Sequence, residues 1–226
     1  MIIFELIIDI TKNVVGLNTL SNLTNIPILT NNRLYKNRID NYRMFIGQGL
    51  ILLGFSELFN ISKEVICEKL KITKYGKPFL NNSKIHFNII HSGKYVGCVF
   101  SFENIGFDIQ ENVNFEVNDI ASEVFSMEEN NYLYNSDNFE DDFIRLWTRK
   151  EALCKYTGTG LNEDILQRTV IKDIYDIYKI YSYKMSNTTW QSICANKKMK
   201  ELRLYKVNTE DLIYLKLPKS FKIFNW

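Results

Sequence analysis

The stretch "DFIRLWTRKEALCKYTGTG", residues 142–160, carries the clearest helix signal in the chain. Apolar residues recur at helical spacing over Asp142–Tyr156, and the glycines that follow are typical of a helix end. Trp147, Glu151 and Lys155 are four residues apart, so we expect them along one side of this helix. The plainest interpretation of that stripe is a buried Trp beside a surface Glu–Lys pair, which adds roughly a few tenths of a kcal/mol.

Upstream of this helix, three short segments have the composition of strands separated by turns. "IHFNII" (Ile85–Ile90) and "YVGCVFSF" (Tyr95–Phe102) flank the turn sequence "HSGK", and "IGFDIQ" (Ile105–Gln110) follows. We expect these three strands to form a meander. Asp108 stands in the last of them, and because an unpaired buried carboxylate is costly, it should be exposed, paired with a base or bound to a cation.

The other segments complete a mixed pattern of helices and strands. The first part of the chain predicts a strand over Ile2–Asp9 and a helix over Asp40–Phe59, with Asp40 as its N-cap. The acidic stretch Met127–Asp142 is expected to be a solvated connection. Sequence rich in Ile, Tyr and Val after residue 170 favours strands. Because helices and strands do not alternate as in a doubly wound sheet, the fold class predicted is α+β.

Length and charge exclude some classes of protein. The chain of 226 residues suits one large domain or two small ones. Its net charge of +2 does not indicate a nucleic-acid binder. The apolar start Met1–Lys12 contains Glu5 and Asp9 and lacks the pattern of a signal peptide, and the apolar run Gly49–Phe55 is far shorter than the ~20 residues that span a bilayer. We therefore expect a soluble cytoplasmic protein with neither membrane nor nucleic acid as a partner.

Cysteine and histidine usage restricts the kind of metal site. The four cysteines are widely spaced and form no C-x-x-C pair, which argues against a zinc site and a disulfide framework. His86 and His91 are the only histidines in the sequence, so any metal should have oxygen ligands.

Asp108 and Glu151 are the candidate ligands. If the helix packs across the Asp108 strand, the two carboxylates converge and need a proton or a cation between them. Gln110 faces the same side of the strand as Asp108 and offers a third oxygen, directly or through water. Mg²⁺ typically uses one or two carboxylates together with phosphate oxygens and water.

Three stretches supply cations that suit a phosphate. "YGKPF" places Lys77 on a turn, and "HSGK" places His91 beside another. "RLYKNRIDNYR" (Arg33–Arg43) places Lys36 and Arg43 near a helix start. Each stretch is also typical of an ordinary turn or a solvated face, so none identifies a site alone.

Taken in order, five stretches resemble one known family: "GKPF", "HFNIIHSG", "IGFDIQ", "FSMEE" and "LWTRKEALCKYTGTGL". Together they resemble the 4'-phosphopantetheinyl transferases of the larger, surfactin-synthetase-associated (Sfp) type. The match is strongest from Tyr75 to Leu161. Its most specific part is the W-x-x-K-E-A-x-x-K motif from Trp147 to Lys155, preceded by G-x-D-I at Gly106–Ile109.

The resemblance implies a fold of two similar α+β halves related by pseudo-two-fold symmetry, with the active site in the cleft between them. Residues 1–104 would form the N-terminal half with the coenzyme A contacts, and residues 105–226 the C-terminal half with the metal site and the carrier-protein docking surface. A short echo between "IIDITKN" (residues 7–13) and "GFDIQEN" (residues 106–112) agrees with two related halves.

The resemblance also implies a reaction. The 4'-phosphopantetheine arm of coenzyme A is transferred to a serine of an apo acyl or peptidyl carrier protein, and adenosine 3',5'-bisphosphate is released. The family uses Mg²⁺, often replaceable by Mn²⁺, and its larger members are monomers. Carriers of antibiotic peptide, polyketide or fatty-acid biosynthesis are all compatible, and the sequence does not choose among them.

Roles at the reaction centre follow from the matched positions. Asp108 and Glu151 correspond to metal ligands, and Gln110 occupies a third ligand position. Glu151 is also the candidate general base for the incoming serine. Lys155 corresponds to the group that meets the pyrophosphate and offsets charge on the leaving phosphate.

Other matched positions imply binding roles. Lys77 and His91 correspond to coenzyme A contacts, Lys36 and Arg43 to weaker candidates for its 3'-phosphate. Glu129 matches an acidic position near the site. Because the acidic stretch up to Asp142 would repel an acidic carrier, docking is expected on Gly158–Thr189, which contains Lys172, Lys179 and Lys184.

Three departures from the family pattern have consequences. Gln110 stands where many members have an acid, which should weaken metal binding. Ile90 replaces a common serine near the nucleotide, and Met44 replaces a small hydroxyl residue near the 3'-phosphate, so coenzyme A affinity should fall.

These departures motivate an alternative, a transferase-like protein that binds carrier domains or coenzyme A without turnover. Retention of Glu151 and Lys155 argues against it. A third interpretation, an unrelated Mg²⁺ enzyme that cleaves phosphodiesters, predicts activity on nucleic acid, and the near-neutral charge speaks against that.

Overall fold

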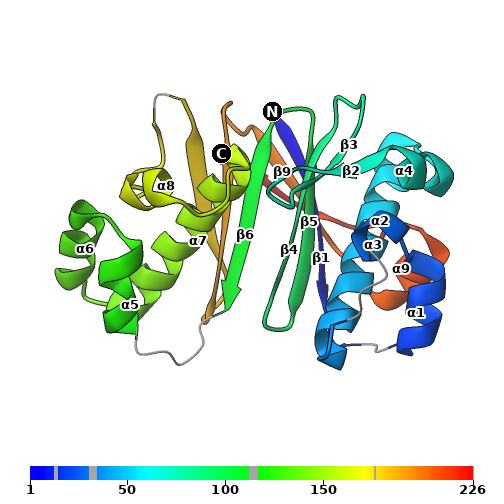
Figure 1. Ribbon diagram of the computed structural model, residues 1–226, viewed down its shortest axis with the longest axis horizontal. Coiled ribbons are helices and arrows are strands. Elements are labelled where there is room, and N and C mark those ends of the chain that lie inside the picture. The colour runs from blue at the N-terminus through cyan, green and yellow to red at the C-terminus, as the bar shows by residue number, and fades with distance from the viewer. Residues whose placement is uncertain (13–14, 31–34, 112–116, 176, 226) are drawn as a thin grey trace. The chain divides into compact units, whose positions relative to one another are not determined.

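The chain divides into two units, residues 1–103 with 199–226 and residues 104–198. The computed structural model describes residues 1–12, 15–30, 35–111, 117–175 and 177–225 (Figure 1). The first division falls one residue from the boundary predicted after residue 104. The last segment differs from the prediction, because residues 199–226 lie in the first unit. The mixed α+β class is confirmed in both units.

The first unit is built on a five-stranded sheet of order β10-β9-β1-β5-β4. β1 is the central strand. It pairs antiparallel with β5 and parallel with β9, so a strand from the last part of the chain lies directly beside the first strand. The strands span, in that order, Lys222–Asn225, Glu201–Lys206, Ile2–Asp9, Tyr95–Ser101 and His86–Ser92. A separate ribbon pairs β2 (Leu70–Ile72) with β3 (Pro78–Leu80). The helices are α1 (Leu17–Thr24), α2 (Pro27–Thr30), α3 (Arg38–Phe59), α4 (Lys63–Lys69) and α9 (Thr209–Tyr214).

The long helix α3 packs against this sheet and supplies more of the first core than any other element. Phe55 lies edge-on to Phe87 and Phe100, with ring centroids 5.3 Å away in both cases. The N-cap of α3 is Asn37, whose side chain accepts the backbone N–H of Ile39. Asp40 is therefore not the cap that the sequence predicted but lies in the first turn, where it pairs with Arg43 at 3.1 Å.

The second unit is a three-stranded antiparallel sheet of order β6-β8-β7 with helices against it. The strands are β6 (Ile105–Glu111), β8 (Thr189–Ala195) and β7 (Lys179–Ser186). The helices are α5 (Val117–Val124), α6 (Met127–Tyr134), α7 (Phe139–Thr157) and α8 (Glu163–Gln167). α7 packs along β6 and β8, and its C-cap is Gly158 at φ 70°, as the glycines after Thr157 predicted.

Two predictions about this region are wrong. The expected meander is not formed: β4 and β5 make a hairpin, but β6 leaves it and pairs with β8 in the other sheet. The acidic stretch 127–142 is not a solvated connection, because it contains α6 and the start of α7. Ser126 and Glu129 form a capping box that starts α6, a pattern that is present in the sequence.

Among the described residues, no single helix is both long and apolar enough to cross a membrane. Only α3 and α4 taken together, with a 116° bend between them, meet that length and composition.

Candidate active site

Gly106 allows α7 to lie directly on β6. A Cβ on Gly106 would overlap the carbonyl oxygen of Ala152 and the backbone nitrogen of Tyr156. The start of β6 is also tied to the end of the helix, because the Asn104 side-chain amide donates to the carbonyl of Tyr156 at 2.8 Å. This close approach brings the side chains of β6 that face the helix to Glu151 and Lys155.

Asp108 and Lys155 meet where the helix crosses the strand. Lys155 Nζ donates to Asp108 Oδ1 at 2.6 Å. The Asp108 side chain is only 4% exposed, and its second oxygen, Oδ2, has no hydrogen-bond partner among the described residues. Asp108 therefore satisfies the sequence expectation of a buried acid paired with a base, but only through one of its two oxygens.

The electrostatics at Asp108 show that a second carboxylate is near. Burial raises the pKa of Asp108 to about 6, the Lys155 ammonium opposes that rise, and the negative charge of Glu151 adds to it. Glu151 is half-buried on α7, one helical turn before Lys155. The two acids that the sequence predicted to converge are thus within electrostatic reach of each other.

The oxygen donors at this point fit a hard cation. Asp108 Oδ2 lacks a donor, Glu151 adds a second carboxylate, and Gln110 lies two residues along β6 on the face of Asp108. In the part of the chain that the structure describes, no group of three or more His, Cys, Asp or Glu side chains could hold a metal alone. A cation here would therefore take two carboxylates and complete its shell with an amide oxygen, water or phosphate.

A small apolar cavity of about 220 Å³ adjoins Gln110. Trp147, the first member of the predicted stripe, lines it and is half-buried. The remaining lining residues are Ile120, Phe143 and Ile144. The stripe of Trp147, Glu151 and Lys155 along one side of α7 thus places an apolar wall next to the charged groups.

Glu129, expected near the site, is a fully buried partner of Lys150. Glu129 Oε2 accepts from Lys150 Nζ at 2.6 Å, and both side chains are 0% exposed. Lys150 also donates to the carbonyls of Leu166 and Arg168, and Glu129 Oε1 accepts the N–H of Val170. This pair connects α6, α7 and the segment after α8, so it holds in place the helix that carries Glu151.

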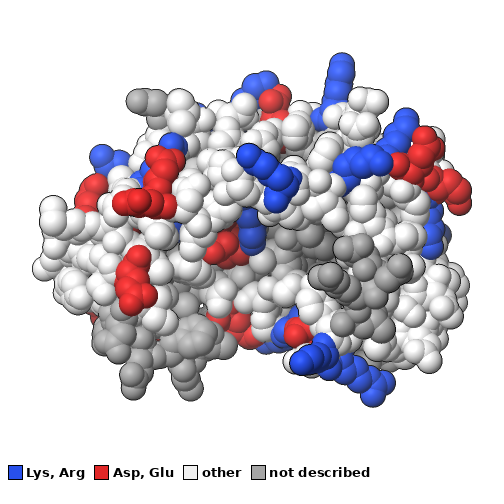
Figure 2. All heavy atoms as spheres, in the orientation of Figure 1, with Lys and Arg blue, Asp and Glu red and all other residues white. Residues whose placement is uncertain are grey.

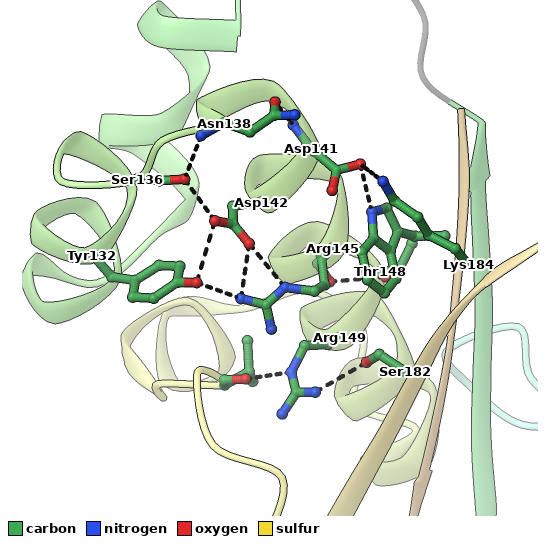
Figure 3. Close-up of polar contacts among 12 residues, drawn as sticks. Tyr132, Ser136, Asn138, Asp141, Asp142, Arg145, Thr148, Arg149, Ser182 and Lys184 are labelled. Atoms are coloured by element: carbon green, nitrogen blue, oxygen red, sulfur yellow. Dashed lines mark hydrogen bonds and ion pairs between the residues drawn. The ribbon is translucent and has the colours of Figure 1, made fainter. Parts of the chain in front are cut away.

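Four further polar groups under this site, three of them buried and Ser182 half-buried, were not recognised in the sequence. They are Thr148 and Arg149 on α7, Ser182 on β7 and Ser192 on β8. Hydrogen bonds link them in a chain, of which Figure 3 shows the bond from Arg149 to Ser182. Thr148 and Arg149 lie inside the W-x-x-K-E motif, which was the available signal. Nothing in the sequence indicated Ser182 or Ser192, because they meet only when the sheet forms.

The predicted coenzyme A contacts all belong to the first unit. Arg43 NH1 pairs with Asp40, and its NH2 donates to the carbonyl of Gly93 in the β4–β5 turn, two residues after His91. His91 is exposed near the end of β4. Arg43 and His91 are therefore brought to the same turn.

Lys77 and Lys36 lie elsewhere in the first unit. Lys77 follows Gly76, which has φ 87°. Burial and the positive charge of Lys77 both lower the pKa of His86. Lys36 is exposed just before α3. Arg33 lies outside the described residues.

Comparison with known proteins supports the resemblance seen in the motifs. Residues 104–200 match the model of the 4'-phosphopantetheinyl transferase superfamily, a range that coincides closely with the second unit. The chain is 33% identical over 133 residues to 4'-phosphopantetheinyl transferase Sfp of Bacillus subtilis (strain 168), which covers 58% of each chain. It is 34% identical over 131 residues to 4'-phosphopantetheinyl transferase gsp of Aneurinibacillus migulanus, covering 56% of this chain and 53% of that protein.

A third relative also matches part of this chain. The L-aminoadipate-semialdehyde dehydrogenase-phosphopantetheinyl transferase of Saccharomyces cerevisiae is 35% identical over 111 residues, 43% of this chain and 41% of that protein. The matched part spans between about two fifths and three fifths of the length of these curated relatives. The resemblance to the Sfp-type transferases is confirmed.

Proposed function

We propose that this chain transfers the 4'-phosphopantetheine arm of coenzyme A to a serine of an apo acyl or peptidyl carrier protein and releases adenosine 3',5'-bisphosphate. One observation carries the proposal. Within the segment that matches the transferase superfamily, Asp108, Glu151 and Lys155 converge, with Lys155 Nζ 2.6 Å from Asp108 Oδ1. Two acids and a lysine at one point suit the transfer of a phosphoryl-type group, which needs charge neutralisation and alignment.

Mg²⁺, replaceable by Mn²⁺, is the proposed cofactor, held by Asp108 and Glu151 with Gln110 at the third position. When bound, the cation would polarise the diphosphate of coenzyme A and neutralise charge that develops during transfer. Because an amide oxygen carries no net charge, Gln110 should hold a cation less tightly than a carboxylate would.

Glu151 and Lys155 take the proton-handling and charge-neutralising roles. The serine oxygen forms a bond to phosphorus, the bond from that phosphorus to the adenosine bisphosphate breaks, and the serine proton passes to Glu151, directly or through water. Glu151 would be less basic with a cation bound to it, and transfer of the proton through water would then be favoured. Lys155 carries three N–H donors, so one can remain on Asp108 while another meets a phosphate oxygen.

The first unit is proposed to bind coenzyme A. Arg43 and His91 approach the β4–β5 turn, and Lys77 and Lys36 add positive charge for the phosphates. The two units would then correspond to two similar halves with pseudo-two-fold symmetry and an active site between them. In both units, a strand with an aspartate is followed later by a long helix: β1 by α3, and β6 by α7. This common order supports the comparison.

The carrier is proposed to dock on the second unit, along the segment 158–189. Lys172 is exposed there, whereas Lys184 is paired with Asp141 at 2.8 Å and is less available to an acidic partner. Figure 2 shows basic and acidic side chains intermixed on the visible face, without a large area of one sign. That distribution fits a protein partner better than nucleic acid.

We further propose a cytoplasmic monomer that serves carriers of antibiotic, polyketide or fatty-acid biosynthesis. Coenzyme A and apo carrier domains meet in the cytoplasm, and the mixed surface charge agrees with a protein in solution.

Intact-mass spectrometry of an apo carrier incubated with the protein, coenzyme A and Mg²⁺ tests the proposed transfer. We expect the carrier to gain the mass of one phosphopantetheine group, and we expect a chelator to suppress the gain. A Glu151→Gln variant is the matched control, because it keeps the shape of the side chain and removes its charge. Folded protein that modifies no carrier among peptidyl, polyketide and fatty-acid types would contradict the proposal and support binding without turnover.

A further inference from the structure

A chain of four hydrogen bonds lies between α7 and the sheet, next to Asp108. Arg149 NH1 lies 3.0 Å from Ser182 Oγ, which is 2.9 Å from Ser192 Oγ. Ser192 Oγ is 2.9 Å from Thr148 Oγ1, which is 2.9 Å from the carbonyl oxygen of Arg145. Figure 3 shows both ends of this chain, Arg149 to Ser182 and Thr148 to Arg145. Thr148 and Ser192 are fully buried, so water does not reach their hydroxyl groups.

The direction of these hydrogen bonds is determined by their two ends. A guanidinium only donates, so Ser182 accepts from Arg149 and its own proton goes to Ser192. A carbonyl only accepts, so the single proton of Thr148 goes to Arg145. Thr148 therefore has no proton left for Ser192, and Ser192 must donate to Thr148. All four bonds are satisfied in this order alone.

Ser192 is the hydroxyl that faces Asp108. The two residues are directly opposite each other in the β6–β8 register, and directly opposite residues place their side chains on the same face about 5 Å apart. Both the Ser192 hydroxyl and Asp108 Oδ2 are buried, but Oδ2 accepts no hydrogen bond from the part of the chain that the structure describes. The acceptor on Thr148 thus competes with Oδ2 for one proton, and Thr148 holds it.

We propose that Thr148 is a positioning residue: by accepting the hydroxyl proton of Ser192, it keeps Ser192 from bonding to Asp108 and leaves Asp108 Oδ2 open to a cation. This inference rests on the proposed function, because it concerns the cation that Asp108 and Glu151 would share. It assigns to the threonine of the W-T-R-K-E sequence a role that is neither ligation nor proton transfer.

The energetics explain why the competing acceptor is needed. A hydroxyl donating to a carboxylate forms a charge-assisted bond, roughly twice as strong as one between neutral groups. Without Thr148 Oγ1, the Ser192 proton would turn to Asp108 Oδ2, and a cation would have to displace it. Asp108 Oδ2 has no hydrogen-bond donor among the described residues, so it is the acceptor that this proton would reach.

Binding of Mn²⁺ to the full chain, measured by electron paramagnetic resonance without coenzyme A or carrier, tests the inference. In Thr148→Val the hydroxyl is replaced by a methyl group of similar size, and Mn²⁺ affinity should fall roughly tenfold. Thr148→Ser restores the acceptor and should bind as the unmodified protein does. The double variant Thr148→Val/Ser192→Ala removes the proton that blocks Oδ2 and should recover the affinity.

Two controls follow from the direction of the chain. Ser182→Ala removes a hydroxyl from the same chain but leaves Ser192 donating to Thr148, so its Mn²⁺ affinity should not change. Ser192→Ala alone should also leave it unchanged. If loss of packing weakened Mn²⁺ binding, the Mn²⁺ affinities of the four variants that lack a hydroxyl group would instead follow their melting temperatures.

The possible outcomes separate this inference from the proposed function. Equal Mn²⁺ affinity in Thr148→Val and the unmodified protein overturns the role of Thr148 alone, as does a double variant that binds as weakly as Thr148→Val. No Mn²⁺ binding by the unmodified protein overturns the cation site and the inference together. If Thr148→Val does not fold, Thr148→Ala, which also lacks the acceptor and relieves any steric conflict, is measured in its place.

Discussion

The buried carboxyl group of Asp108 makes the stability of the fold depend on pH. Its carboxyl group is 4% exposed, accepts one hydrogen bond from Lys155, and has a pKa raised to about 6, mainly by burial. Between the ordinary pKa of 3.8 and about 6, the folded chain keeps a proton that the unfolded chain has lost. The favourable contribution of Asp108 is therefore present at low pH and lost as the pH rises through about 6.

Replacing this carboxyl group should remove that pH dependence. Between pH 4 and pH 7, we expect the free energy of unfolding of Asp108→Asn to rise by up to roughly 3 kcal/mol relative to that of the unmodified protein. Urea unfolding of both proteins at a series of pH values, with chelator present, measures the difference. Mg²⁺ should narrow it, because only the carboxylate gains from the cation. Parallel pH profiles for the two proteins would show that Asp108 is not perturbed in the fold.

Glu129 is expected to matter for stability because Lys150 is buried with it. Glu129→Gln leaves the ammonium of Lys150 without a charged partner in a place where both side chains are 0% exposed. Breaking a buried pair in this way costs roughly 3 kcal/mol. Chemical unfolding of Glu129→Gln and of its neighbour Glu128→Gln measures this, since Glu128 is exposed and should change stability by less than about 1 kcal/mol. Similar losses of stability in both variants would mean that the buried pair contributes no more to stability than an exposed glutamate does.

At the level of single residues, the sequence predicted the groups that a motif places at a regular spacing. Asp108, Glu151 and Lys155 were all identified, since a strand and a helix each determine which residues share a side. The sequence did not predict that Asp108 would be paired through one oxygen only. That property depends on which groups surround Asp108 in the fold. One of them, Ser192, is 84 positions later in the chain and lies opposite Asp108 only through the β6–β8 register.

Among the helices and strands, the contact of α7 with β6 is the one that assembles the candidate site. It depends on the absence of a side chain at Gly106, because a Cβ there would overlap the backbone of Ala152 and Tyr156. Backbone cannot turn aside as a flexible side chain can, so the helix would have to move away from the strand.

Gly106→Ala should therefore both destabilise the protein and separate Asp108 from Lys155. We expect a loss of roughly 3 kcal/mol in the free energy of unfolding, together with weaker Mn²⁺ binding. Gly16→Ala is the matched control, because a Cβ on Gly16 would have its nearest neighbour at 3.9 Å. Chemical unfolding and Mn²⁺ titration of both variants give the comparison. An unchanged Mn²⁺ affinity in Gly106→Ala would mean that the helix does not need this approach to form the site.

The sequence predicted individual elements better than their partners. β1, β5, β6, α3 and α7 all fall where periodicity and turn residues predicted them, to within a few residues. The meander was wrong because the short turn after β5 is compatible with either a third hairpin strand or an exit to another sheet. Local sequence cannot choose between them, because the choice depends on β8, more than 80 residues further on.

For the whole molecule, the division into two units depends on a pairing that joins the two ends of the chain. β9 pairs in parallel with β1, with Leu6 opposite Tyr205. The sheet of the first unit is therefore complete only when the last segment is present. The sequence analysis placed that segment in the C-terminal half, since parallel partners so distant along the chain leave no local pattern. The second unit, residues 104–198, is continuous and contains every strand of its own sheet.

Removing the last segment should therefore unfold one unit and spare the other. In a chain that ends at Lys198, β1 keeps β5 but loses β9, and the buried side chains of Leu202 and Leu204 are lost with that strand. We expect hydrogen exchange to show lost protection in β1, β4 and β5 and retained protection in β6, β7 and β8. A chain that ends at Ser220 lacks only β10, whose residues are mostly exposed, and should keep protection in both units. Equal protection of both units in the chain that ends at Lys198 would show that the first unit folds without β9. The pairing of the two chain ends would then not be needed for that unit.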